Sequence, residues 1–305
     1  MKAVRFSEYG DPSVLRYEDV EQPVPAAGQV RIRVAATSFN GVDGNIRAGF
    51  MQGPIPVTLP HTPGLDVAGT VDALGPDVDT VAVGDQVIGF LPMTGLGASA
   101  EYVLAPAEIL TAAPSSIPLV DAAALPTVGL TAWQALFDHA ELTAGQRVLI
   151  NGAGGAVGDY AVQLAKNAGA YVIGVAGARS AGRVRAADEV LDPDSAGKAE
   201  PVDVVVNLAP VAPEQLAALV TLIRPGGVLV NTTVWMPAPS DEERGVRGVN
   251  LFVRSDAEQL AGLVALVDAG KLNVDVARRV PLAALASVHA EPGAVPGKTV
   301  IVVGS

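Results

Sequence analysis

The pattern of apolar and polar positions divides the chain into two parts of different character. In the first part, residues 30–34 alternate apolar and charged side chains, which is typical of a strand with one buried face. Further short apolar runs at 67–74, 85–90 and 99–104 are separated by Gly-Pro and Gly-Asp turn signals. This spacing predicts a β-rich first part, folded as a small barrel or sandwich.

After Pro118 the pattern alternates between strands and helices. Residues 120–140 are rich in alanine with helical spacing, and the apolar runs that follow are separated by helical segments. The predicted strands of this part are 147–151, 170–175, 203–207 and 227–231, with a last strand at 299–303. A further helix is expected from an N-cap at Ser255 to Ala269. Strands and helices at this spacing indicate βαβ units around a parallel sheet.

Length and charge limit the classes of protein that this chain can represent. The 305 residues are about twice the length of an average domain, which favours two domains. The net charge is −12, and no Lys/Arg run exceeds two residues, so neither a nucleic-acid partner nor an anionic membrane surface is expected. The N-terminus becomes polar by residue 7, and the longest apolar stretch, 122–137, is too short to span a membrane. The sequence therefore predicts a cytoplasmic protein.

The chain contains no cysteine. This excludes disulfides, thiolate nucleophiles and every zinc site that uses cysteine ligands. The three histidines, His61, His139 and His289, lie far apart in the sequence and form no pair on one helix face. No metal site is predicted.

The glycine-rich turn after residue 151 is the most informative motif. The predicted strand 147–151 leads into Gly152, Gly154 and Gly155, and a helix with regular apolar spacing begins at Ala156 and Val157. Glycines there permit a tight turn and close approach of a ligand, while the free N–H groups of the helix start attract a pyrophosphate. An ordinary strand-to-helix turn is the alternative, but the strand before and the helix after favour a dinucleotide site.

The end of the next strand indicates which dinucleotide is bound. No acidic residue occurs between residues 160 and 187, so the carboxylate that an NAD site uses to bind the ribose is missing. Arg179 and Ser180 stand where a 2′-phosphate would lie, which predicts a preference for NADPH. The alternative is that Arg179 is a solvated loop residue.

Several motifs in a fixed order resemble those of the medium-chain dehydrogenase/reductase superfamily, most closely its zinc-free quinone oxidoreductase branch. Besides the glycine-rich turn, they are Pro63-Gly-Leu-Asp-Val-Ala-Gly69, Val83-Gly-Asp-Gln-Val-Ile-Gly89, Ala100-Glu-Tyr-Val103, Leu130-Thr-Ala-Trp133, Arg224-Pro-Gly-Gly227 and Gly297-Lys-Thr-Val300. The resemblance implies an α/β protein with a GroES-like β-rich catalytic domain, residues 1–118 and 255–305. It also implies a Rossmann doubly wound parallel sheet, residues 119–254.

The resemblance also implies a set of site residues. Asn40, Asp43 and Arg47 form the Asn-x-x-Asp segment with its basic residue and are the catalytic candidates, although Asp43 and Arg47 are equally expected to form an internal ion pair. The positions of the zinc ligands in the zinc-dependent relatives hold Asn40, Leu65 and Thr127. The cofactor-binding candidates are Asn40, Thr127, Thr131, Gly152, Gly154, Gly155, Ala156, Val157, Arg179, Ser180, Asn207 and Lys298.

The function implied is a metal-free hydride transfer from NADPH to a small apolar carbonyl compound or quinone. The acceptor is a quinone or the C=C bond of an α,β-unsaturated carbonyl. A dedicated enoyl or alkenal reductase is one alternative, and a non-catalytic NADPH-binding sensor or structural protein is another. The second gains weight because the tyrosine that many relatives carry after the Asn-x-x-Asp segment is missing, with Asn45, Phe50 and Met51 in its neighbourhood. A homodimer paired along residues 249–253 is also expected.

Overall fold

The computed structural model describes residues 1–233, 235–291 and 297–304. The chain forms two compact units, Met1–Thr127 with Ser255–Ser305 and Val128–Arg254. The domain bounds expected from the sequence, 1–118 with 255–305 and 119–254, stay a prediction.

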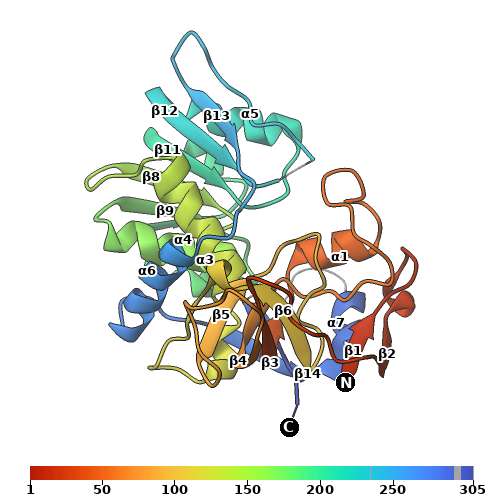
Figure 1. Ribbon diagram of the computed structural model, residues 1–305. Coiled ribbons are helices and arrows are strands. Elements are labelled where there is room, and N and C mark those ends of the chain that lie inside the picture. The colour runs from red at the N-terminus through yellow and green to blue at the C-terminus, as the bar shows by residue number, and fades with distance from the viewer. Residues whose placement is uncertain (234, 292–296, 305) are drawn as a thin grey trace. The chain divides into compact units, whose positions relative to one another are not determined.

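The first unit is built on a seven-stranded sheet (Figure 1). Its strands run in the order β14-β15-β3-β4-β5-β7, and β6 also pairs with β3. Among the described strands of this sheet, β14 and β15 pair in parallel and the other pairings are antiparallel. The bounds are β3 (Gln29–Ser38), β4 (Asp66–Leu74), β5 (Gln86–Phe90), β6 (Tyr102–Pro106), β7 (Leu110–Ala112), β14 (Val276–Pro281) and β15 (Lys298–Val302), and a separate pair is formed by β1 (Lys2–Arg5) and β2 (Arg16–Asp19). The β-rich first part predicted from the sequence is confirmed.

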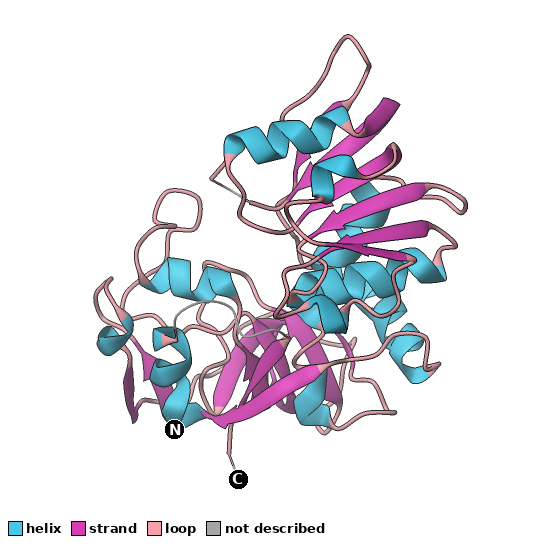
Figure 2. Cartoon of the chain, turned by 180° about the vertical axis from the view of Figure 1, so that it is seen from behind, coloured by secondary structure: helices cyan, strands magenta, loops and turns pink. Residues whose placement is uncertain are grey.

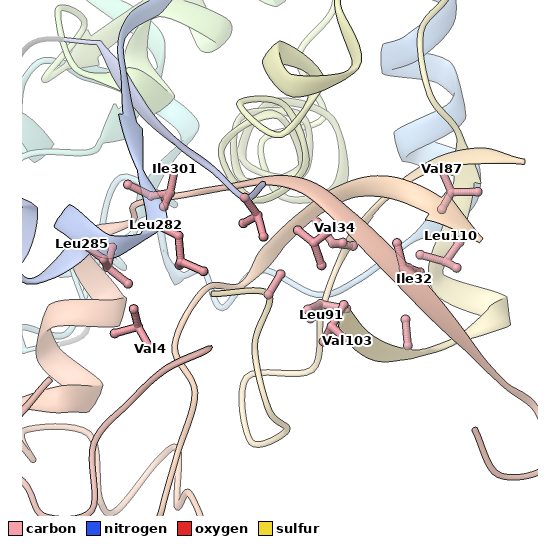
Figure 3. Close-up of a cluster of buried hydrophobic side chains, with 14 of the residues drawn as sticks. Val4, Ile32, Val34, Val87, Leu91, Val103, Leu110, Leu282, Leu285 and Ile301 are labelled. Atoms are coloured by element: carbon pink, nitrogen blue, oxygen red, sulfur yellow. The ribbon is translucent and has the colours of Figure 1, made fainter. Parts of the chain in front are cut away.

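The core of this unit lies beneath the face of β3 that carries the apolar side chains. Val30, Ile32 and Val34 are buried, whereas Arg31 and Arg33 alternate with them on the other face. Figure 3 shows Ile32 and Val34 with Leu282, Leu285 and Ile301 from the C-terminal segment, all members of one buried cluster. Described residues of the C-terminal segment therefore complete the core of the first unit.

Short helices border this sheet. They are α1 (Gly41–Arg47), α2 (Leu119–Ala122), α6 (Ala257–Asp268) and α7 (Leu285–Ala290). The N-cap of α6 is Asp256, whose side chain accepts a hydrogen bond from the N–H of Gln259 at 3.0 Å. The prediction of Ser255 as the cap is wrong, because the Ser255 hydroxyl instead donates to the carbonyl of Phe90 at 2.6 Å.

The second unit contains a six-stranded, all-parallel sheet in the order β10-β9-β8-β11-β12-β13. The chain passes from β8 outward to β9 and β10, and then returns to β11 and continues to β12 and β13 on the other side. The bounds are β8 (Arg147–Asn151), β9 (Tyr171–Val175), β10 (Glu189–Leu191), β11 (Val202–Asn207), β12 (Ile223–Asn231) and β13 (Arg247–Asn250). This is the doubly wound order expected for a Rossmann sheet, and its direction switches between β8 and β11.

Both faces of this sheet are buried, and helices lie along it (Figure 2). Leu149 and Ile173 pack with Leu216 of α5 (Pro213–Thr221), while Val148 and Val172 point to the opposite face and are equally buried. Two further helices are α3 (Pro126–Trp133), which continues as a π-helical segment to residue 139, and α4 (Ala156–Asn167).

Two of the helical segments are shorter than in a regular doubly wound fold. The stretch expected to be helical from 120 to 140 is divided between α2 and α3, and Pro126 begins α3, where its missing N–H does no harm. Between β9 and β10 the chain forms a 3₁₀ turn, Ala181–Arg183, in place of an α-helix.

In the described part of the chain, no helix is both long and apolar enough to cross a membrane.

Candidate active site

The Asn-x-x-Asp segment forms the start of α1, in the first unit. The carboxylate of Asp43 accepts hydrogen bonds from the N–H of Asn40 at 2.8 Å and from the N–H of Gly64 at 3.1 Å. It therefore closes the first turn of the helix and holds the loop at Gly64, which has a φ of +105°. Burial raises the pKa of Asp43 to about 6 in spite of the two N–H donors. Both oxygens of this carboxylate serve to position the backbone.

Asp66, the first residue of β4, is the centre of a buried polar cluster. Its Oδ2 accepts hydrogen bonds from the Ser38 hydroxyl and from Nδ2 of Asn40, the latter at 2.9 Å. Its Oδ1 accepts from the N–H of Thr127 at 2.7 Å. The side chain is fully buried, so these hydrogen bonds take the place of the hydration that the carboxylate would have in solution.

Lys298 brings the matching positive charge to this cluster. Its ammonium group donates to Oδ1 of Asn40 and to the carbonyl of Phe39, and lies 3.4 Å from Oδ2 of Asp66. Burial lowers the pKa of Lys298, and the two nearby carboxylates, Asp66 and Asp43, oppose that shift. The structure thus brings Asn40, Asp43 and Lys298 together around Asp66, and both ends of the Asn40 amide already have partners within the cluster.

Arg47 does not join this cluster. It lies at the C-terminal end of α1, seven residues and about 10 Å of helix from Asn40. The charged or titratable groups that it influences are Asp11 and His289 rather than Asp43. The internal ion pair between Asp43 and Arg47 that the sequence left open is absent from the described residues. Arg47 is buried, and its Nε and Nη1 atoms have no hydrogen-bond partner in the structure.

The positions expected to correspond to zinc ligands do not fit a zinc ion. Leu65 is aliphatic and buried, and Asn40 and Thr127 are bonded to Asp66. A leucine has no donor atom, so a three-ligand set of this kind cannot form at these positions. Within residues 1–233, 235–291 and 297–304, no group of three His, Asp or Glu side chains is arranged to hold a metal ion.

The glycine-rich turn lies in the second unit, between β8 and α4. Gly152 has a φ of +88°, which disfavours any residue with a side chain. A Cβ atom on Gly154 would lie 2.4 Å from the Ser180 hydroxyl, and one on Gly158 would lie 2.3 Å from the Gly152 carbonyl. Gly155 is the N-cap of α4, and Ala156 and Val157 are its first residues. Their N–H groups at the helix start fit the pyrophosphate of a dinucleotide.

The loop that follows β9 packs against this turn. Ser180 faces Gly154, which places Arg179 next to the glycine-rich turn. Arg179 is exposed, and no hydrogen bond or ion pair in the described residues engages its guanidinium group. The nearest acidic residue beyond the loop, Asp188, binds Lys166 at 2.8 Å and the N–H of Val172 at 2.7 Å. Because Val172 is near the start of β9, this carboxylate lies at the opposite end of the strand from the loop.

The remaining cofactor candidates are buried. Asn207 ends β11, and its side chain bonds to Asn151 on one side and Asn231 on the other. Thr127 and Thr131 are both in α3, four residues apart, with Thr127 in the first unit and Thr131 in the second.

Sequence reasoning missed Asp66, Ser38 and three of the four asparagines that end β8, β11, β12 and β13. A signal existed for Asp66, since a charged residue inside the apolar run Gly64–Gly69 needs a buried partner. A signal existed for the asparagines as well, because each ends a predicted apolar strand or lies just before Leu251.

Two family models match the chain. The model described as "Alcohol dehydrogenase GroES-like domain" matches residues 26–115, and the model described as "Zinc-binding dehydrogenase" matches residues 176–301. The first match covers most of the β-rich sheet, and the second begins at the end of β9.

Known proteins match nearly the whole chain. A chloroplast envelope quinone oxidoreductase homolog from Arabidopsis thaliana is 33% identical over 303 residues, covering 92% of each chain. The solved quinone oxidoreductase of Coxiella burnetii has a TM-score of 0.90 at 31% identity, covering 100% of this chain and 99% of that one. A structure described as an NAD-dependent alcohol dehydrogenase has a TM-score of 0.89 at 29% identity, covering 100% of both chains.

Proposed function

Because the chain belongs to the quinone oxidoreductase branch of the medium-chain dehydrogenase/reductase superfamily, whose members use a nicotinamide cofactor, we propose that it is an NADPH-dependent reductase. Its substrates are a quinone or the C=C bond of an α,β-unsaturated carbonyl compound. When bound, the cofactor supplies the hydride. The protein supplies the binding, the orientation and the donors for the oxygen on which charge develops.

The residues that follow β9 are the basis for proposing NADPH rather than NADH as the cofactor. Ser180 against Gly154 puts Arg179 beside the turn that fits the pyrophosphate, and this guanidinium has no competing partner among the described residues. Asp188, the next acidic residue along the chain, is held at the start of β9 by Lys166 and the N–H of Val172, so it is not placed to bind a free 2′-hydroxyl. A cation without a nearby acid favours a 2′-phosphate.

Measured dissociation constants for NADPH and NADH test this assignment. We expect the purified protein to bind NADPH at least about tenfold more tightly, because a charge-assisted contact to phosphate contributes on the order of 1.5–3 kcal/mol. In Arg179→Gln the preference should disappear while the affinity for NADH stays unchanged. Arg247→Gln, the same change at the exposed start of β13, is the matched control. Equal affinities of the wild-type protein for the two cofactors would reject NADPH as the preferred one.

In the first unit, two side chains are candidates for stabilising the developing oxyanion. One N–H of Asn40 is bonded to Asp66, and the other has only a long contact of 3.5 Å with the carbonyl of Ser38. Arg47 has unpaired donors but lies at the other end of α1. We propose that Asp43, Asp66 and Lys298 act on Asn40 as positioning residues, and that water supplies the proton.

Steady-state NADPH oxidation with a panel of quinones and enones tests the reaction. We expect turnover with at least one acceptor class, and a lower kcat in Asn40→Ala with an unchanged dissociation constant for the substrate if Asn40 acts in the transition state. Turnover of enones alone would assign the protein as a dedicated enoyl or alkenal reductase. NADPH oxidation that stays at background with every acceptor would overturn the proposal in favour of a non-catalytic NADPH-binding protein.

We also propose that two copies pair along β13. Among the described strands, β13 is at the edge of the six-stranded sheet with β12 beside it, although the N–H of Gly248 already donates to the Ser240 hydroxyl at 3.0 Å. The remaining groups of an edge strand can serve as a template for a second strand. Light scattering coupled to size exclusion should give twice the mass of one chain, and a monomer at micromolar concentration would contradict the pairing.

A further inference from the structure

The four strands on one side of the doubly wound sheet all end in asparagine. Asn151 ends β8, Asn207 ends β11, Asn231 ends β12 and Asn250 ends β13. Each is the direct register partner of the next across the parallel pairings. In-register neighbours on parallel strands share one face and lie about 4.8 Å apart, so their short amide side chains can bond in a row. We call these four residues the asparagine row.

The bonds of the asparagine row run in one direction. Nδ2 of Asn151 donates to Oδ1 of Asn207 at 2.7 Å, and Nδ2 of Asn207 donates to Oδ1 of Asn231 at 2.8 Å. The last contact, from Nδ2 of Asn231 to Oδ1 of Asn250, is long at 3.5 Å. Asn151, Asn207 and Asn231 are all buried, so the amide atoms that bond along the row have one another rather than water as partners.

Backbone groups fix this direction. Nδ2 of Asn231 donates to the carbonyls of Met236 at 2.7 Å and Thr233 at 3.1 Å, and carbonyls can only accept. The amide of Asn231 therefore presents its oxygen to Asn207, and Asn207 donates a hydrogen bond to that oxygen from its own Nδ2 group. Asn207 in turn presents its oxygen to Asn151. The carbonyls of Thr233 and Met236 thus determine the orientation of an amide two strands away.

As a result, Asn151 presents its side-chain oxygen at the beginning of the glycine-rich turn. This Oδ1 atom accepts no hydrogen bond from any residue that the structure describes, and it is not one of the unpartnered side-chain atoms that the protein encloses completely. The row cannot flip to offer an N–H group there without breaking the bonds to Asn207. Asn151 is therefore a fixed acceptor at the point where the sheet changes direction.

We propose that Asn151 recognises the nicotinamide half of the bound dinucleotide, its Oδ1 accepting a hydrogen bond from a hydroxyl or amide group of that half. This rests on the proposed dinucleotide site. A pyrophosphate has no donor to offer at neutral pH, so it is not the partner of this oxygen. The adenosine half belongs over β9, where Arg179 and Ser180 lie, and the other half extends over β11 and β12. The row extends from Asn151 in that second direction.

Calorimetric titration of Asn151→Leu with two probes tests the proposal. NADP⁺ carries both halves, whereas adenosine 2′,5′-bisphosphate carries only the adenosine half. We expect the dissociation constant of NADP⁺ to rise about tenfold and that of the bisphosphate to change by less than about twofold. Asn250→Leu, the same change at the far end of the row, should leave both constants within about twofold of the wild-type values.

Two results would overturn the proposal. One is wild-type affinity of Asn151→Leu for NADP⁺, and the other is an equal loss for both probes, which would show that Asn151 only shapes the turn. If the wild-type protein prefers NAD⁺, the proposed cofactor preference fails, and NAD⁺ with AMP as the pair of probes still tests Asn151. If it binds no dinucleotide, both proposals fail.

A measurement on the wild-type protein covers the case in which Asn151→Leu does not fold. With the protein labelled at asparagine nitrogen, the side-chain amide resonances of Asn151 should shift on addition of NADP⁺ and stay in place with adenosine 2′,5′-bisphosphate. Shifts of the same size with both probes would contradict recognition of the nicotinamide half.

Discussion

The change Asp66→Asn tests the buried polar cluster of the first unit more sharply than any other substitution. Asp66 is fully buried and its carboxylate receives donors from Ser38, Asn40 and Thr127, with the ammonium group of Lys298 at 3.4 Å. An asparagine keeps one acceptor oxygen and turns an NH₂ group toward at least one of these donors. It also removes the negative charge that offsets Lys298.

The expected loss of stability follows from this geometry. A buried donor left facing another donor costs about 1–3 kcal/mol, and breaking a buried ion pair by removing one partner costs about 3–5 kcal/mol in total. We therefore expect Asp66→Asn to lower the unfolding free energy of the first unit by about 3–5 kcal/mol. Adding Lys298→Met removes the uncompensated cation, so the double variant should lose at least about 1 kcal/mol less than the two single variants together.

Hydrogen exchange measured by mass spectrometry on peptides from β3 and β4 is the suitable assay. Both tryptophans, Trp133 and Trp235, belong to the second unit, so intrinsic fluorescence does not report on the first. Asp72→Asn is the matched control. It lies on the same strand and pairs with Arg31 at 2.7 Å, but its side chain is 30% exposed. The Asp72→Asn change should lower the unfolding free energy of the first unit by less than about 1 kcal/mol.

Two outcomes would refute the reasoning. If Asp66→Asn costs no more than Asp72→Asn, the cluster does not hold a buried charge pair. If the losses of Asp66→Asn and Lys298→Met simply add in the double variant, the two side chains are not coupled.

Three further predictions concern the rest of the molecule. Burial lowers the pKa of His61 to about 4 and that of His289 to about 3, so the folded state binds fewer protons than the unfolded state below pH 6.5. The unfolding free energy should therefore fall on acidification, by about 2 kcal/mol per histidine at pH 5. Asp43, whose pKa is raised to about 6, contributes a smaller change of the opposite sign because its folded state binds a proton more readily. Thermal unfolding of His61→Leu should show a shallower pH dependence, and an unchanged one would contradict the assignment. Gly158→Ala should destabilise the second unit by about 1–3 kcal/mol in urea, followed by tryptophan fluorescence, because its Cβ would lie 2.3 Å from a backbone oxygen; wild-type stability would show that the turn can shift. Arg47→Met should leave the unfolding free energy unchanged or raise it, since a buried cation without hydrogen bonds is removed, while kcat falls at least about tenfold. A wild-type kcat would remove Arg47 from the reaction.

Features set by neighbours in the sequence were predictable. The alternation at residues 30–34 predicted a strand whose inner face is buried, and β3 has that pattern. The glycine-rich turn was predictable because a strand, a turn without side chains and a helix follow one another within twenty residues. The helix cap was misplaced by one residue, because the Ser255 hydroxyl bonds to Phe90, which is 165 positions away. Local propensity could not reveal that competitor.

The sequence by itself determined the elements, the turn chemistry and the residue types present, including the complete lack of cysteine. Only the tertiary structure decided which side chains meet. Lys298 and Asn40 are 258 positions apart and are joined because β15 pairs with β3. The asparagine row exists only because four strands end in register. Strand order and register are cooperative properties of the whole core, and a one-residue shift in any pairing would turn these amides to the other face of the sheet.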